Sequence, residues 1–245
     1  MASCRTHRRR SDRVLLSPDE WQIVGLSLKV SGVAVALTLP VAFGLAYLLA
    51  RGKFPGKILL DALVYLPLVL PPVVTGWLLL IGFGLRGPIG SRVHDWFGLT
   101  LIFRWTGAAL AAGIMALPLM VRAMRLSIEA VDRRIEGAAR TLGASDWRVF
   151  WTITVPLALP GILAGIVLGF ARSIGEFGAT ITFVSNIPGE TQTLPIAIYA
   201  ALQVPGSDAI VTRLALISVV LSLGALIVSE LLARRAGVGR GGHVL

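Results

Sequence analysis

Five long apolar segments dominate this chain and limit it to one broad kind of structure. Hydrophobic residues make up 55% of its 245 residues and charged residues only 15%, whereas soluble domains carry about a quarter charged residues. A helix needs about 20 mainly apolar residues to cross a bilayer. The segments that reach this length cover roughly residues 22–50, 58–85, 105–128, 157–184 and 209–233. We therefore predict an all-α membrane protein with five transmembrane helices in a domain over 21–235, between tails 1–20 and 236–245.

The distribution of basic residues predicts the orientation of these spans. Cytoplasmic loops of membrane proteins collect Lys and Arg. Loop 51–57 carries three cations and no acid, and loop 122–150 carries six arginines. The C-terminal tail is also basic, whereas segment 185–208 has neither Lys nor Arg. This pattern places the N-terminus outside and the C-terminus inside.

Two segments conflict with this topology, and a third raises the alternative of a sixth span. Segment 86–104, with Arg86, Arg92 and Arg104, and the arginine-rich N-terminal tail would both lie outside despite their charge. A natural start near Val14 or Leu15 would remove the second conflict. Counting 191–203 as a sixth span would place the basic tail outside, and this stretch is too short and polar to cross. We expect it to be a re-entrant or surface helix.

Other functional classes find little support in the composition. The net charge of +10 arises from basic residues at segment ends and in loops, which fits a lipid bilayer as partner and not nucleic acid. The single cysteine, Cys4, excludes a disulfide framework. His7, His94 and His243 are far apart and the acids are scattered, so we predict no metal site and no enzyme. An ion-coupled secondary transporter would show inverted repeats, and none is visible. The first apolar segment is too long for a cleavable signal peptide.

The segment 130–156, called the coupling loop below, combines charge with small residues. Four side chains fall at i, i+3, i+4 and i+7 and so share one face of a helix: Ile135, Ala138, Ala139 and Leu142. Gly143 suits the left-handed end of that helix. Ser145 suits the cap of a second short helix, and Pro156 or Pro160 the start of the next span. The loop therefore predicts a short helix presented to the cytosol, with Glu136 and the arginines away from its apolar face.

The spacing of the coupling loop resembles that of bacterial ABC-importer permeases. Their pattern is Glu-Ala-Ala, three residues, Gly, nine residues, Ile, one residue, Leu-Pro. This chain has Gly137-Ala138-Ala139, then Gly143, Ile153 and Val155-Pro156. Gly137 replaces the acid, which Glu136 supplies one residue earlier, and Val155 replaces the leucine. The resemblance implies that Glu136, Gly137, Ala138, Ala139, Leu142, Gly143 and Pro156 dock on an ATPase subunit. The alternative is an amphipathic helix lying on the membrane.

Two further blocks resemble the permeases of bacterial molybdate importers. They are 66–76, which begins Leu-Pro-Leu-Val-Leu-Pro-Pro, and 171–195, with its Gly-Glu-Phe-Gly core and the continuation Asn-Ile-Pro-Gly-Glu-Thr. Together with the coupling loop, the resemblance covers nearly all of 18–235. It implies a type I ABC-importer permease fold, related to the sulfate and thiosulfate permeases. Tungstate, sulfate and thiosulfate remain alternative cargoes.

The resemblance also implies partners. The permease would act as a homodimer in the bacterial cytoplasmic (inner) membrane, with two ATPase subunits and a periplasmic molybdate-binding protein. This chain has no phosphate-binding loop, so ATP and Mg would be used by the partner ATPase, and the chain itself would bind no cofactor. Segments 86–104 and 185–208 would receive the binding protein.

The candidate pathway residues allow two interpretations each. Arg172 and Glu176 are spaced i, i+4 and form a structural ion pair or contact the anion. Gly161, Gly165, Gly169 and Ser173 form a ridge of small residues that packs within the chain or forms the seam between two permease copies.

The second span contains the remaining candidates. Pro67, Pro71 and Pro72 interrupt it, because proline removes a backbone hydrogen-bond donor. Broken helices at membrane depth are tolerated where they line a cavity, so this interruption marks a candidate part of the pathway. Thr75, together with Thr180 and Thr182 in the fourth segment, offers hydroxyls either to a passing oxyanion or to its own backbone.

Overall fold

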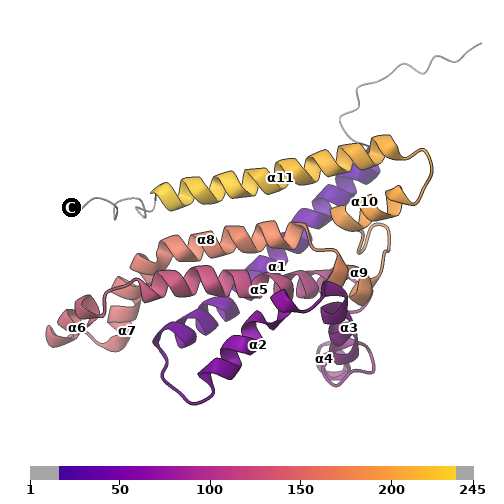
Figure 1. The fold of residues 1–245 in the computed structure, drawn as a ribbon. Coiled ribbons are helices and arrows are strands. Elements are labelled where there is room, and N and C mark those ends of the chain that lie inside the picture. Colours follow the sequence, from indigo (N-terminus) through magenta and orange to yellow (C-terminus); the bar gives the residue numbers. More distant parts are fainter. Residues whose placement is uncertain (1–16, 236–245) are drawn as a thin grey trace, which may run out of the picture.

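The computed structural model describes residues 17–235, which form helices and connecting loops without a strand in that range (Figure 1). The possible start near Val14, Cys4, His7, His243 and the tail 236–245 lie outside the described residues. The elements are α1 (Pro18–Arg51), α2 (Lys57–Val69), α3 (Pro72–Phe83), α4 (Gly90–Phe97), α5 (Trp105–Glu129), α6 (Arg133–Thr141), α7 (Asp146–Val149), the π-helix η1 (Phe150–Thr154), α8 (Val155–Ile174), α9 (Gly178–Val184), α10 (Leu194–Leu202) and α11 (Asp208–Arg235).

Four helical stretches are long and apolar enough to cross a membrane. They are α1 with 34 residues, α5 with 25, the continuous stretch Asp146–Ile174 with 29, and Asp208–Val228 within α11. The pair α2 and α3 passes the same test jointly but is bent by 115°. The prediction of an all-α membrane protein with up to five spans is therefore confirmed for the described residues.

The ends of α1 follow from local chemistry. Ser17 and Glu20 form a reciprocal capping box, and Pro18 occupies the first turn, where its missing N–H costs nothing. The helix therefore begins at Pro18, a few residues before the apolar segment expected from residue 22. At the other end, the helix stops at Arg51 and Gly52 is extended.

The second apolar segment breaks where its prolines predict. α2 ends at Val69, Leu70 is extended, and α3 begins at Pro72. Pro67 lies inside α2 and does not end it. The loop that follows contains α4, which the sequence analysis did not anticipate. Within segment 191–203, residues Leu194–Leu202 form the short helix α10.

The fourth segment corrects two predictions. Residues 157–184 are not one helix: α8 ends at Ile174, and 178–184 form the separate helix α9. The start also differs, because α7, η1 and α8 are continuous instead of being separated at Pro156 or Pro160. A π-helix explains this, since Val155 N donates to Phe150 O and so widens the turn just before Pro156, which cannot donate.

Helix α5 lies at the centre of the fold and packs against α1, α2, α8 and α9. Its buried face consists largely of glycine and alanine, from Gly107 through Ala116. Such small residues let helices approach closely. In a membrane, helix association depends on van der Waals packing because the hydrophobic effect does not drive it there. Figure 1 shows α1 crossing behind α5 and α8, with α11 lying along α8.

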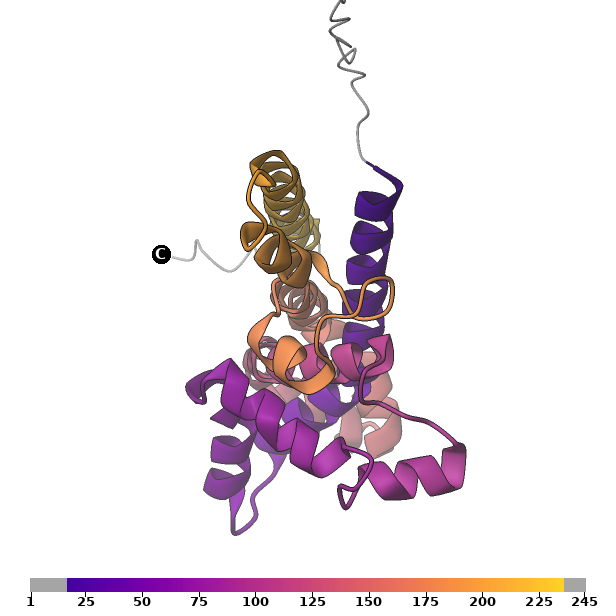
Figure 2. The same cartoon turned by 90° about the vertical axis from the view of Figure 1, so that its right-hand side faces the viewer.

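The helices leave two distinct ends. One, called the α6 end, holds α6, α7 and the last turns of α1 and α11 (Figure 1). The opposite end, called the α9 end, holds α3, α4, α9, α10 and the first turns of α1 and α11. Figure 2 views the molecule from this second end and shows α1 and α11 entering on either side of α10 and the loop before it. The predicted topology makes the α6 end cytoplasmic.

Candidate functional site

Helix α6 projects from its end of the molecule and is fixed by capping on both sides. Asp132 Oδ1 accepts a hydrogen bond from Arg134 N at 2.8 Å and so begins the helix. Gly143 adopts φ +85, a conformation that favours glycine, and the chain turns there. Ser145 Oγ accepts from Arg148 N at 3.4 Å and begins α7. The predicted helix, its glycine end and the serine cap are thus all present.

The apolar face of α6 is open. The Leu142 side chain is 88% exposed and Ile135 50% exposed, although both are large and apolar. Ala138 is exposed and Ala139 is half-buried. Exposed apolar side chains gathered on one short helix are typical of a surface that another protein covers.

Glu136 lies on the opposite face of α6, as its helical position predicts, and is buried there. Its side chain is only 9% exposed, and its Oε1 lies 2.9 Å from Arg51 Nη2. Thr154 Oγ1 donates to the same oxygen at 2.8 Å. The carboxylate therefore faces the membrane helices, and the acid predicted to dock on an ATPase is committed to contacts within the chain. Neither Arg51 nor Thr154 was among the candidate residues.

The glycine ridge of α8 packs against α5 of the same chain. A Cβ at Gly161 would lie 2.2 Å from Ser127 Cβ, and one at Gly169 would lie 2.7 Å from the Met120 side chain. A Cβ at Gly165 would meet Met124 at 2.9 Å. These distances leave no room for a side chain, so the structure favours intramolecular packing over a seam between copies for the three glycines.

Glu176 joins α8 to α9. Arg172 Nη1 lies 2.6 Å from its Oε2, and Ala179 N donates to its Oε1 at 2.9 Å. The Glu176 side chain is 2% exposed. Both oxygens are therefore occupied by groups of this chain, which is the arrangement of a structural ion pair and helix cap rather than of an anion ligand.

Helices α3 and α9 form one tightly packed unit at the α9 end. A Cβ at Gly76 would lie 2.6 Å from Ala179 O, and one at Gly178 would lie 2.7 Å from Pro72 Cβ. Pro71 and Pro72 themselves are exposed, whereas Thr180 is buried.

Two candidate hydroxyls are buried without a partner. Thr75 Oγ1 and Ser173 Oγ have no hydrogen-bond partner among the described residues, and these residues are 5% and 4% exposed. Thr182 Oγ1 instead donates to Gly178 O of its own helix. In this conformation neither free hydroxyl is open to solvent, so contact with a passing anion would require the helices to separate.

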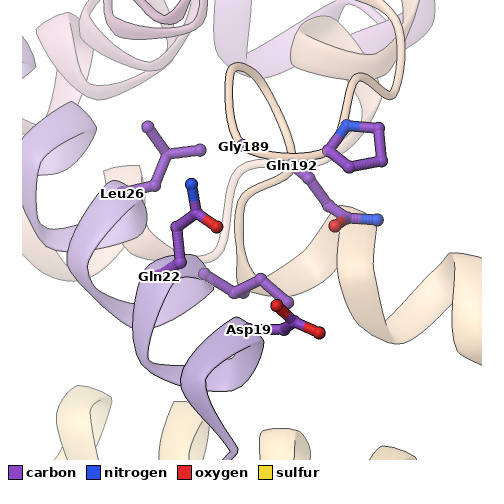
Figure 3. Close-up of a pocket in the computed structure, with 7 residues that line it drawn as sticks. Asp19, Gln22, Leu26, Gly189 and Gln192 are labelled. Atoms are coloured by element: carbon purple, nitrogen blue, oxygen red, sulfur yellow. The ribbon is translucent and has the colours of Figure 1, made fainter.

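A cavity of about 240 Å³ opens at the α9 end between α1 and the loop before α10 (Figure 3). Asp19 and Gln22 line it from α1, and Gly189 and Gln192 from the loop. This cavity borders segment 185–208, which was expected to receive a binding protein.

An aromatic cluster at the α6 end was missed by the sequence analysis. Trp147 and Trp151 surround Phe150, which also meets Tyr47 of α1 at 5.2 Å between ring centroids. Trp147 is 71% exposed. The signal was available, since positions 147, 150 and 151 share a helical face. Aromatic residues of this kind collect at the membrane–water interface.

Among residues 17–235, no group of three or more His, Cys, Asp or Glu side chains could hold a metal ion. The described residues combine apolar helices long enough to cross a membrane with an exposed short helix at one end.

Comparison with known proteins defines the class. A family described as the inner membrane component of binding-protein-dependent transport systems matches residues 40–238. Because this match covers most of the chain, the chain belongs to that family of membrane permeases, and it is an integral membrane protein.

Individual relatives narrow the comparison. The molybdenum transport system permease protein ModB of Escherichia coli (strain K12) is 60% identical, over 90% of this chain and 96% of the relative. ModB of Haemophilus influenzae is 55% identical, over 88% and 94%. The sulfate transport system permease protein CysW of Synechocystis is 37% identical, over 86% and 77%.

A solved structure confirms the fold. A bacterial ABC transporter that imports the polysaccharide alginate superposes with a TM-score of 0.70 and 19% identity, over 90% of this chain and 80% of that chain. At this identity the likeness concerns the fold alone. It agrees with the predicted type I ABC-importer permease.

Proposed function

We propose that this chain is the membrane permease subunit of an ATP-driven importer for molybdate, located in the bacterial cytoplasmic membrane. The observation that carries the proposal is the 60% identity to a molybdenum transport permease over 90% of the chain. This span includes the coupling loop and the block 171–195. The sulfate transport relative is much less similar, at 37% identity, which favours molybdate over sulfate or thiosulfate. Tungstate is a dianion nearly isosteric with molybdate and is the second cargo to test.

The proposal assigns complementary tasks to partners. Two copies of this chain would enclose the pathway, and two ATPase subunits would dock on the exposed faces of α6. ATP and Mg would be held by those subunits, and the permease would need no cofactor of its own. A binding protein loaded with the anion would dock at the α9 end, over 86–104 and 185–208, where the cavity beside Gln22 and Gln192 lies.

The helix that follows α6 suggests how movement would pass through the membrane. Asp146–Ile174 is continuous, and at 1.5 Å per residue its 29 residues extend about 40 Å. At its far end, Glu176 couples it to α9, which is packed tightly on α3. A displacement of α7 by an ATPase would therefore be transmitted along this continuous helix to the α3–α9 unit.

The permease need not bind the anion tightly. A dianion is costly to bring into an apolar core, and both oxygens of Glu176 are occupied, so this carboxylate would not act as a ligand. Buried hydroxyls such as those of Thr75 and Ser173 would become partners for the anion only when the pathway opens. Selectivity would then reside mainly in the binding protein.

Reconstitution tests the proposal. The permease, its ATPase and its binding protein would be incorporated into liposomes, and ATP hydrolysis and anion uptake measured with molybdate, tungstate and sulfate in turn. We expect molybdate to stimulate both activities. Stimulation by sulfate alone would overturn the cargo assignment, and uptake by this chain without the ATPase would overturn the ABC mechanism.

A further inference from the structure

Three segments that are far apart in the sequence meet at one buried charge pair. Arg51 is the last residue of α1, and its Nη2 donates to Glu136 Oε1 at 2.9 Å and to Val131 O at 3.3 Å. Thr154 Oγ1, at the end of η1, donates to the same Glu136 oxygen at 2.8 Å. The end of α1, the first turns of α6 and the entry to α8 are thereby joined.

The burial of this pair makes the connection stiff. The side chains of Arg51 and Glu136 are 13% and 9% exposed. Each charge depends on the other, because a charge left alone at a buried site is strongly unfavourable. Hydrogen bonds between charged groups are also shorter and stronger than neutral ones. The pair therefore resists separation, in contrast to an ion pair in solvent.

Helix α6 has few other connections to α1 and to the other helices outside the continuous stretch Asp146–Ile174. Its main backbone neighbours are α7 and η1, which lie next in the chain. Its apolar face is open, as the exposure of Ile135 and Leu142 shows. Contact between α6 and α1 is consequently concentrated in the Arg51–Glu136 pair.

We propose that Arg51 is a positioning residue that fastens the coupling helix to the first span, with Glu136 as its partner. When an ATPase moves α6, the pair makes α1 move together with α8, so that ATP hydrolysis produces transport. Glu136 thus acts within the permease and does not contact the ATPase. The inference rests on the proposed function in one respect: α6 must be the surface that an ATPase moves.

The test compares uptake with hydrolysis in the reconstituted complex. Arg51→Gln and Glu136→Gln each remove one charge, and the exchange of both residues, R51E with E136R, reverses the pair. Arg140→Gln is the matched control, because Arg140 lies on α6 like Glu136 and pairs with Asp146 of α7 at 2.6 Å, but its side chain is 51% exposed. We expect the two single variants to lower molybdate uptake per ATP by about tenfold, within the usual range of coupling between sites. The exchange should recover part of the loss, and the control should stay near wild type.

Several results would overturn the inference. One is an unchanged uptake per ATP in Arg51→Gln. Another is a loss of ATPase binding in Glu136→Gln that Arg51→Gln does not share, which would mean that Glu136 contacts the ATPase. If the charge variants do not fold, Thr154→Val removes a single hydrogen bond and should lower the same ratio to a smaller extent; an unchanged ratio there would also contradict the inference.

Failure of the proposed function would look different. In that case the wild-type complex itself would hydrolyse ATP without importing molybdate. The pairing can then be examined without cargo, by a double-mutant cycle on the unfolding of the purified permease. Additive effects at positions 51 and 136 would show that the two residues are independent and would refute the connection.

Discussion

The close contact between α5 and α8 leads to a quantitative prediction. In Gly161→Ala, the new Cβ would lie 2.2 Å from Ser127 Cβ and 2.8 Å from Ala123 O, whereas ordinary contact begins at 3.4 Å. The helices must therefore separate by roughly 1.2 Å at this point, which is the difference between 3.4 and 2.2 Å. Overpacking of this kind costs about 1–3 kcal/mol.

Gly25→Ala in α1 is the matched control. It also replaces a glycine inside a long helix, but no heavy atom lies within 4 Å of the added Cβ. In both variants the higher helix propensity of alanine over glycine stabilises the helix by about 1 kcal/mol. The difference in the free energy of unfolding between them should therefore equal the overpacking cost alone.

Unfolding of the purified permease in detergent, followed by tryptophan fluorescence, provides the measurement. For a chain of this length 1 kcal/mol corresponds to about 2–4 °C in the unfolding midpoint, so Gly161→Ala should unfold clearly below Gly25→Ala. Equal midpoints would refute the packing argument. A change in dimerisation without a change in midpoint would instead place the ridge at the seam between copies.

Two further predictions concern the ends of the molecule. Gly143→Asp should abolish ATPase binding and uptake while leaving the permease in the membrane. Gly98→Asp is the control and should bind the ATPase normally, because Gly98 has a positive φ and open surroundings like Gly143 but lies at the α9 end. Pull-down of the ATPase by each variant measures the difference. Normal transport by Gly143→Asp would contradict the docking assignment. Glu176→Gln breaks a buried ion pair and should lower the free energy of unfolding by about 3–5 kcal/mol, whereas Glu129→Gln, whose pair is far more exposed, should change it by about 0.5 kcal/mol or less. Similar unfolding curves for these last two variants would contradict the structural role of Glu176.

Hydropathy was sufficient to locate the spans because each must bury about 20 apolar residues. The third span, expected over 105–128, is α5 at Trp105–Glu129. The break near Pro71 was also predictable, since proline acts through its own covalent geometry. The cap at Ser145 and the turn at Gly143 are equally local.

The remaining features depend on tertiary contacts that the sequence pattern does not contain. The start of α9 is capped by Glu176, which accepts from Ala179 N, while the residues on both sides of the break are apolar enough to continue a span. The glycine ridge predicts close packing, but small residues do not specify their partner, and only the fold shows that this partner is α5.

The orientation of Glu136 was predicted only in part. Helical periodicity placed it away from the apolar face, which was correct, but a polar face is normally solvated. Here that face meets Arg51, contributed from 85 residues earlier in the chain. With the acid turned inward and Gly137 lacking a side chain, an ATPase that docks on α6 meets Ile135, Ala138 and Leu142 instead of a carboxylate. Shape and apolar contact, rather than an ion pair from this acid, should then govern the affinity of that interface.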